Sequence, residues 1–268
     1  MKIYAMSDIH GHLDVLNENL KYVDLSGDNK IIFLGDYIYY GPDSAGVLRK
    51  ILNLYKEYGE DKVIVLKGNH EEMLLSWIKE FKNPVSKDDE ILFFDSWLKS
   101  DAEEDYKTYK TFISDEKMSD FLKNEGKMSF FSLNHEAVKL LLSENADLLA
   151  FIRSMKSYYE TDSQIFVHAG VDEDMEENWK WGSDDTFLWK YPFSTGSFIK
   201  TIIAGHVGSA TVSGDNSFHD IYFDGKSHYY IDGSIYKGGR LPLLMYDSGN
   251  GKYYEIKEGE KHLIDAYI

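Results

Sequence analysis

The stretch Ile31-Ile32-Phe33-Leu34-Gly35-Asp36 decides the fold, because it is a short apolar run that ends on a glycine and a carboxylate. Four consecutive apolar residues followed by Gly are typical of a buried strand that leaves a sheet. An Asp at that point lies where the sheet passes the chain to a loop, and α/β proteins build their sites at such strand ends. The alternative is a loop Asp that caps the next turn.

The same pattern recurs along the chain, which favours a functional role over a cap. A hydrophobic run is followed closely by Asp, His or Asn, next to Gly or another small residue, and the positions are Asp8, His10, Asn69, His70, His168 and His206. A single buried His is more often a satisfied core residue than a ligand. Several such positions are hard to explain by packing, because each would bury a polar group that needs its own partner. The pattern therefore predicts a metal centre.

Three strand–helix units open the chain and predict a parallel sheet. The expected strands are Lys2–Met6, Ile31–Leu34 and Val63–Leu66. The expected buried helix positions are Leu13, Leu16, Leu20 and Val23, then Leu48, Ile51, Leu52 and Tyr55, and then Met73, Leu74, Trp77, Ile78 and Phe81. Amphipathic spacing of this kind is typical of helices that cover a sheet.

The rest of the chain predicts a helical insert followed by a second group of strands. Residues 84–157 are charged, lack strand-like runs and contain recurring helical patterns. The expected later strands are Gln164–Val167, Thr201–Ala204, Asp220–Phe223, His228–Ile231, Leu243–Tyr246 and Tyr253–Ile256, with an acidic loop at 173–185. We therefore expect an α/β (α+β) fold, a two-sheet β-sandwich flanked by helices, as a single domain over residues 1–268 with the insert at about 84–157.

Composition limits the function classes. The formal net charge is −17 over 268 residues, so a free chain would repel nucleic acid and anionic membranes, and local cations would have to come from elsewhere, such as bound metal ions. Cys is absent, which excludes disulfides and thiolate metal sites. No signal-peptide pattern and no membrane-length apolar run is present, so we expect a cytoplasmic protein with no membrane partner.

The candidate ligands combine oxygen and nitrogen donors without sulfur. Imidazole with carboxylate suits Mn²⁺, Fe or Zn²⁺ better than Mg²⁺ or Ca²⁺, and Mn²⁺ is our first choice. The ligands are too many for one ion. Two divalent metal ions ~3.5–4 Å apart that share a carboxylate are suited to phosphate ester hydrolysis, in which a hydroxide between them attacks phosphorus.

The chain resembles the calcineurin-like metallophosphoesterases. The resemblance rests on five blocks in the family's order, Asp8-Ile9-His10-Gly11, Gly35-Asp36, Gly68-Asn69-His70-Glu71, Val167-His168-Ala169-Gly170 and Gly205-His206. It is closest to the phosphoprotein phosphatase branch, including bacterial serine/threonine phosphatases and diadenosine tetraphosphatases. The segment 231–241 also matches that branch.

The resemblance implies a role for each candidate residue. Asp8, His10 and Asp36 would hold one metal ion, and Asp36 would bridge to a second. Asn69, His168 and His206 would complete the second site. His70 would be the catalytic histidine, which contacts the phosphate or protonates the leaving oxygen.

Two substitutions depart from the branch. Tyr39 stands where the branch has the Asp that orients the catalytic His, and Tyr40 stands where it has the Arg that grips phosphate. A lysine such as Lys67 cannot reproduce the planar fork with which arginine grips phosphate. Arg240 is then the best remaining phosphate anchor, followed by Lys67, while we expect Lys190 to be a solvated surface charge.

These features predict a hydrolase of phosphate monoesters that resembles serine/threonine protein phosphatases. The nearest alternative is a nucleotide or dinucleoside polyphosphate hydrolase or a phosphodiesterase, because Tyr39 and Tyr40 could stack on a base. A second alternative is a non-catalytic metal-binding relative, although the complete set of candidate ligands in this chain argues against that alternative. The expected partner is a phosphorylated substrate, either phosphoprotein or nucleotide, and not a nucleic acid duplex. The oligomeric state stays open.

Overall fold

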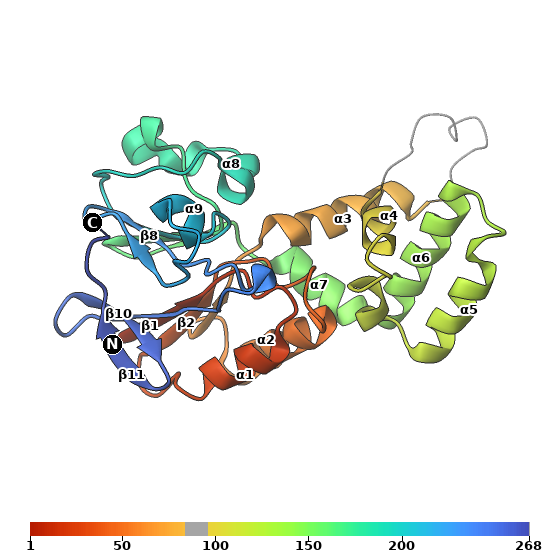
Figure 1. Cartoon of the computed structure of the whole chain (residues 1–268), viewed down its shortest axis with the longest axis horizontal. Coiled ribbons are helices and arrows are strands. Elements are labelled where there is room, and N and C mark those ends of the chain that lie inside the picture. Colours follow the sequence, from red (N-terminus) through yellow and green to blue (C-terminus); the bar gives the residue numbers. More distant parts are fainter. Residues whose placement is uncertain (84–95, 268) are drawn as a thin grey trace.

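The computed structural model describes residues 1–83 and 96–267 and consists of two β-sheets packed face to face with helices on their outer sides (Figure 1). This arrangement confirms the predicted mixed α/β sandwich. In the described part of the chain, no helix combines the length and the apolar character needed to cross a bilayer.

The first sheet contains the strands of the N-terminal units and the C-terminal hairpins. Its strands are β1 (Lys2–Met6), β2 (Lys30–Phe33), β3 (Val63–Val65), β9 (Leu243–Asp247), β10 (Lys252–Lys257) and β11 (Glu260–Leu263). Their order is β11-β10-β9-β1-β2-β3. β1, β2 and β3 are parallel, as predicted, and β9 joins β1 in antiparallel fashion.

The second sheet is built from the later strands. Its strands are β4 (Tyr158–Glu160), β5 (Gln164–Val167), β6 (Thr201–Ala204), β7 (Tyr222–Phe223) and β8 (His228–Tyr230). The order is β4-β5-β6-β8-β7, with β5, β6 and β8 parallel. Each sheet therefore contains three neighbouring parallel strands, and the carboxyl ends of such strands lead into the loops where α/β proteins build their sites.

Side-chain alternation divides the core between the two faces of each sheet. Ile3 and Ala5 of β1 lie in the cluster between the sheets, whereas Tyr4 and Met6 lie in the cluster on the helical side. Phe166 of β5 meets the first pair from the opposite sheet. Successive strand residues point to opposite faces, so this period of two fixes the register of the sandwich.

Helices cover the outer faces and form an extension beyond one end. They are α1 (Leu13–Leu20), α2 (Ser44–Tyr58), α3 (Asn69–Phe81), α4 (Trp97–Ala102), η2 (Tyr109–Phe112), α5 (Asp115–Glu125), α6 (Phe130–Glu144), α7 (Ala146–Ser154), η3 (Glu173–Trp181), α8 (Asp184–Trp189), α9 (Ser209–Ser213) and η4 (Ile235–Lys237). Figure 1 shows α5 and α6 at the end of the long axis opposite the sheets. The described part of the predicted insert is therefore helical, and residues 84–95 lie outside the described chain.

The insert is tied to α3 by a buried contact. Trp77 of α3 donates its indole N–H to Asn134 of α6 over 2.7 Å, and the ring of Trp97 in α4 lies 5.1 Å from the Trp77 ring. The same hydrophobic cluster continues from the sheet through these helices. The helix that begins at the site thus also carries the extension.

Several sequence-based details were wrong. α1 ends at Leu20, so Val23 lies beyond the helix, and Met73 is 36% exposed instead of buried. The expected loop at 173–185 contains η3 and the start of α8. The strand expected from Asp220 begins at Tyr222, and the short strands β4 and β11 were not predicted.

Candidate metal centre

The candidate site lies where strands of both sheets end. Asp8 follows β1 and Asp36 follows β2, while His168 and His206 follow β5 and β6. The loops are joined by backbone hydrogen bonds, including the N–H of Asp8 to the carbonyl of Gly35 over 3.1 Å. The topology therefore brings four distant segments to one edge of the sandwich.

The backbone at these strand ends adopts an unusual conformation. Asp8, His10, Asp36 and His206 all have positive φ, between 45° and 63°. Asp and His enter this region more readily than most residues, but it is still sparsely populated. Strained backbone of this kind concentrates at functional sites, where the surrounding structure holds it in place.

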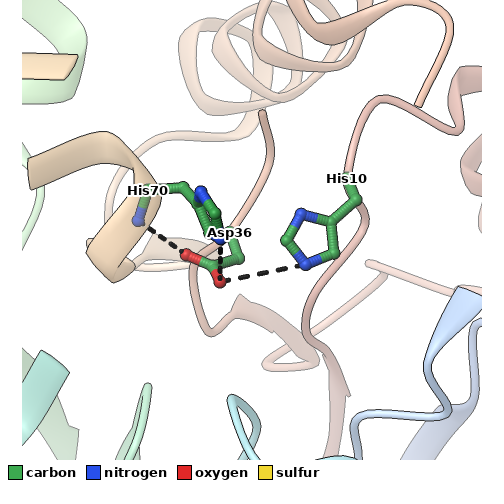
Figure 2. Close-up of side chains that lie close together, drawn as sticks. All are labelled: His10, Asp36 and His70. Carbon is green, nitrogen blue, oxygen red and sulfur yellow. Dashed lines mark hydrogen bonds and ion pairs between the residues drawn. The ribbon is translucent and has the colours of Figure 1, made fainter. Parts of the chain in front are cut away.

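Asp36 occupies the centre of the cluster (Figure 2). Its Oδ2 lies 3.4 Å from His168 Nε2, 3.8 Å from His70 Nε2 and 3.9 Å from His10 Nε2. These separations exceed those of good hydrogen bonds. They are near the separation of two ligand atoms that share one ion through bonds of about 2.0–2.2 Å.

A second set of contacts surrounds Asn69, in the first turn of α3. Its Oδ1 lies 2.8 Å from His168 Nε2 and 3.0 Å from His206 Nδ1. Donor atoms of Asp36, His168 and His206 all lie within 4.8 Å of one another, as do those of His10, Asp36 and His70. Asp36 belongs to both groups, so the geometry fits two ions that share this carboxylate.

Backbone carbonyls fix the orientation of two imidazoles. His10 Nδ1 lies 3.0 Å from the Ile38 carbonyl, and His168 Nδ1 lies 3.0 Å from the Leu34 carbonyl. Such a contact places the proton on Nδ1 and leaves the Nε2 lone pair directed into the site. This outer contact is characteristic of metal-binding histidines.

The electrostatics of the cluster favour an ionised Asp36. Burial opposes its ionisation, but His168 and His70 outweigh burial and hold the pKa of Asp36 well below its usual range. Burial lowers the pKa of His168, yet Asp36 outweighs it and raises that pKa to about 9. Burial and His168 lower the pKa of His206 to about 4. A metal ion would replace the proton on His168, as ligand binding generally requires.

His70 differs from the carbonyl-bound histidines. Its Nδ1 is buried and has no hydrogen-bond partner among the described residues. Its ring instead stacks on Tyr39, with ring centroids 5.1 Å apart and planes 22° apart. The His70 side chain is 12% exposed, so it lies at the open edge of the cluster.

Glu71 was missed as a site residue by the sequence reasoning. It is fully buried in the first turn of α3, and its carboxylate accepts N–H groups from Asp36, Tyr37, Ile38 and Gly68 at 2.9–3.3 Å. Glu71 therefore ties the loop that carries Asp36 to the helix that carries Asn69 and His70. Its position three residues after Gly68, as in a capping box, was the available signal.

Asp232 is a second residue without a predicted role. It is 3% exposed and follows β8, and burial raises its pKa. The pKa values of Asp8 and His10 both respond to its charge, which places it beside the cluster. The run Tyr229–Ile231 followed by Asp and Gly repeats the strand-end pattern, so this residue could have been found from the sequence.

The predicted phosphate anchors have other partners. Arg240 pairs with Asp220 and lies 2.8 Å from Glu255 Oε1, and Lys67 Nζ lies 2.8 Å from Glu72 Oε2. These ion pairs already neutralise both side chains and disfavour the predicted phosphate contact, which stays a prediction. Lys190 was expected to be solvated, but it is partly buried and lies 3.2 Å from Glu173 Oε1.

Comparison with known families shows to which family the chain belongs. The family model described as calcineurin-like phosphoesterase matches residues 1–210. The protein belongs to the calcineurin-like phosphoesterase family, as its strand-end blocks predicted.

Two curated relatives match part of the chain. The symmetrical bis(5'-nucleosyl)-tetraphosphatase of Wigglesworthia glossinidia brevipalpis is 35% identical over 89 residues, which are 33% of this chain and 31% of the relative. The corresponding protein of Acidovorax sp. (strain JS42) is 34% identical over 89 residues, which are 33% of this chain and 30% of the relative. The matched segment thus spans less than a third of the length of either relative.

Solved structures share the fold. A cold-active protein-tyrosine phosphatase of a psychrophilic Shewanella sp. superposes with a TM-score of 0.56 at 15% identity, over 98% of this chain and 80% of that chain. A protein serine/threonine phosphatase of Saccharomyces cerevisiae gives a TM-score of 0.52 at 14% identity, over 98% of this chain and 79% of that chain. At these identities the likeness shows the fold alone.

Proposed function

We propose that this protein is a metal-dependent phosphoesterase that hydrolyses phosphate monoesters. The observation that carries the proposal is the position of Asp36, whose Oδ2 lies within 3.4–3.9 Å of three imidazole Nε2 atoms. A buried carboxylate surrounded by imidazoles at this spacing fits a cation better than it fits direct hydrogen bonds.

The donor set supports a pair of divalent cations. Asp8, His10 and Asp36 would hold one ion, and Asp36 with Asn69, His168 and His206 would hold the other. Oxygen and nitrogen donors without sulfur favour Mn²⁺, with Fe or Zn²⁺ as alternatives. When bound, two such ions supply positive charge for the phosphate oxygens and lower the pKa of water at the site.

His70 is proposed as the proton donor to the leaving oxygen. It lies as near to Asp36 Oδ2 as His10 does, but its Nδ1 has no carbonyl partner, unlike those of His10 and His168. Without a carbonyl at Nδ1 the His70 ring can carry its proton on Nε2, the nitrogen that faces Asp36, and a general acid needs such a proton whereas a metal ligand cannot keep it. Such an acid contributes about 10²–10⁴-fold to the rate.

The test is hydrolysis of p-nitrophenyl phosphate with Mn²⁺, compared with bis-p-nitrophenyl phosphate. His70→Ala should lower kcat by about 10²–10⁴-fold and leave Mn²⁺ binding intact. His262→Ala is the matched control, because His262 is exposed on β11. Mn²⁺ binding without hydrolysis of any substrate would instead support the non-catalytic alternative, and a diester preference would overturn the monoester assignment.

A second candidate function is hydrolysis of dinucleoside polyphosphates. It is favoured by the tetraphosphatase relatives, which are 35% and 34% identical over 89 residues. Diadenosine tetraphosphate belongs in the same substrate panel for this reason. A kcat/KM for it at least about tenfold above that for p-nitrophenyl phosphate would select this function over the monoesterase.

A further inference from the structure

Three tyrosines, which we call the tyrosine wall, stand beside the candidate metal centre. Tyr39 and Tyr40 come from the loop after β2, and Tyr236 lies in η4. Tyr40 and Tyr236 are stacked, with ring centroids 4.5 Å apart and planes 15° apart, and Tyr39 meets the edge of Tyr40 at 4.7 Å. Each of the three side chains is only partly buried, so the wall is accessible to a ligand.

The wall contacts the candidate metal ligand His10 and the candidate general acid His70. The His10 ring lies 5.1 Å from the Tyr40 ring and 5.0 Å from the Tyr236 ring, and the His70 ring lies 5.3 Å from Tyr40. Aromatic rings interact favourably at centroid distances of about 4.5–7 Å. A ring attached directly to the ester oxygen would therefore lie within reach of the wall, whereas a ribose separates a nucleobase from its phosphate.

The backbone places these rings at a conformational cost. Tyr39 and Tyr40 have φ values of 78° and 63°, and Ser234, at the start of η4, has a φ of 54°. Bulky residues seldom adopt positive φ, and they keep it only where the surrounding structure enforces it. Two consecutive tyrosines in this conformation indicate that the position of their rings is specified by the fold.

The charges around the wall suit one phosphate more than a chain of phosphates. Lys67 and Arg240 are paired with carboxylates. Lys237 Nζ lies 5.0 Å from the Tyr236 ring centroid and places a positive charge at the border of the wall, while the three rings themselves are uncharged. An uncharged aryl group matches the three rings better than further phosphates do.

We propose, building on the phosphoesterase function above, that the tyrosine wall selects phosphate monoesters whose leaving group is an aryl ring, the class that includes tyrosine phosphate. In the reaction, water adds its oxygen to phosphorus and the bond from phosphorus to the aryl oxygen breaks. The electron pair stays on the aryl oxygen, which takes a proton from His70. One proton of the attacking water returns to His70 and the other stays on the phosphate, so the products are a phenol and hydrogen phosphate.

Binding of phosphonates tests the wall without any leaving-group chemistry. Phenylphosphonate and butylphosphonate are titrated calorimetrically into the protein with and without Mn²⁺. The wild type should bind phenylphosphonate about 3- to 10-fold more tightly, the range expected for aromatic contacts. Tyr236→Leu should abolish the preference, and Tyr236→Phe, which keeps the ring, should retain it. Tyr22→Leu is the matched control, because Tyr22 is 39% exposed beyond the end of α1.

Hydrolysis of phenyl phosphate and butyl phosphate separates this inference from the proposed function. If neither ester is hydrolysed, the phosphoesterase function fails, but the phosphonate titration still shows whether the wall prefers an aryl group. If both are hydrolysed and Tyr236→Leu lowers both rates equally, with no phosphonate preference, the aryl selection is refuted. A wall-dependent preference for adenosine monophosphate over phenyl phosphate would also overturn it, because the wall would then bind a base.

Discussion

Replacing Gly205 by Ala tests whether the packing of two strand-end loops sets the position of a metal ligand. Gly205 directly precedes His206, and a Cβ at this position would lie 2.2 Å from Asp8 Oδ2 and 2.0 Å from Ser7 Oγ. Ordinary contacts of a Cβ are 3.4–4 Å, so both oxygens would have to move by more than about 1 Å. No positive φ complicates the substitution, because Gly205 does not adopt one.

The displaced carboxylate is buried and hydrogen-bonded, which sets the magnitude. Asp8 Oδ2 accepts the Ser7 hydroxyl at 2.5 Å and the His206 N–H at 3.0 Å. Overpacking costs about 1–3 kcal/mol, and loss of one hydrogen bond to a charged group costs about 1.5–3 kcal/mol. We expect Gly205→Ala to lower the free energy of unfolding by about 2.5–6 kcal/mol. Affinity for Mn²⁺ should fall at least about tenfold, because ligands tolerate displacements of only about 0.5 Å.

Urea unfolding of the metal-free protein and calorimetric Mn²⁺ titration measure the two effects. Gly126→Ala is the control, because a Cβ there meets nothing within 4 Å and the residue has a φ of −67°. That variant should stay within about 1 kcal/mol of the wild type. The reasoning would be refuted by a Gly205→Ala protein with wild-type Mn²⁺ affinity and a stability equal to that of the control.

Tyr39→Leu should lower kcat about 2- to 10-fold by releasing the stacked His70 ring, and Tyr39→Phe should not; equal kcat for both variants would contradict this. Glu173 and Asp224 raise the pKa of the buried His228 despite its desolvation, so its charged form stabilises the fold fully below about pH 6.5, and this contribution is lost as the pH rises through the raised pKa. Urea unfolding of His228→Gln should therefore show a larger deficit at pH 6 than at pH 9, and a constant deficit would exclude this account. Removal of metal with EDTA should lower Tm, and excess Mn²⁺ should restore it, since a ligand at 100 times its Kd stabilises by about 2.7 kcal/mol; an unchanged Tm would oppose specific binding.

The central strands could be predicted because their burial is visible in the sequence. The run Ile31–Leu34 is buried on both faces, so it contains no polar residue that could suggest another structure. β11 was missed because all four of its residues are exposed at a sheet edge and therefore carry no apolar pattern. β4 has only three residues, all partly buried, and its pairing depends on β5.

The candidate site was predictable where a candidate ligand directly follows such a strand, and it was not where tertiary contacts decide. Asp36 and His168 were expected to lie close together, and Asp36 Oδ2 is 3.4 Å from His168 Nε2. The Glu71 carboxylate accepts hydrogen bonds from N–H groups of a loop 33–35 residues away in the sequence, and no local pattern reveals this contact. For Arg240, the sequence could not show that Glu255, from β10, pairs with its guanidinium.

Anomalous diffraction from crystals grown with Mn²⁺ tests the central claim most directly. The account predicts two manganese peaks about 3.5–4 Å apart on either side of Asp36. One peak should contact Asp8 and His10, and the other should contact Asn69 and His168. A single peak, or peaks that Asp36 does not touch, would contradict the shared-carboxylate centre and the functions proposed from it.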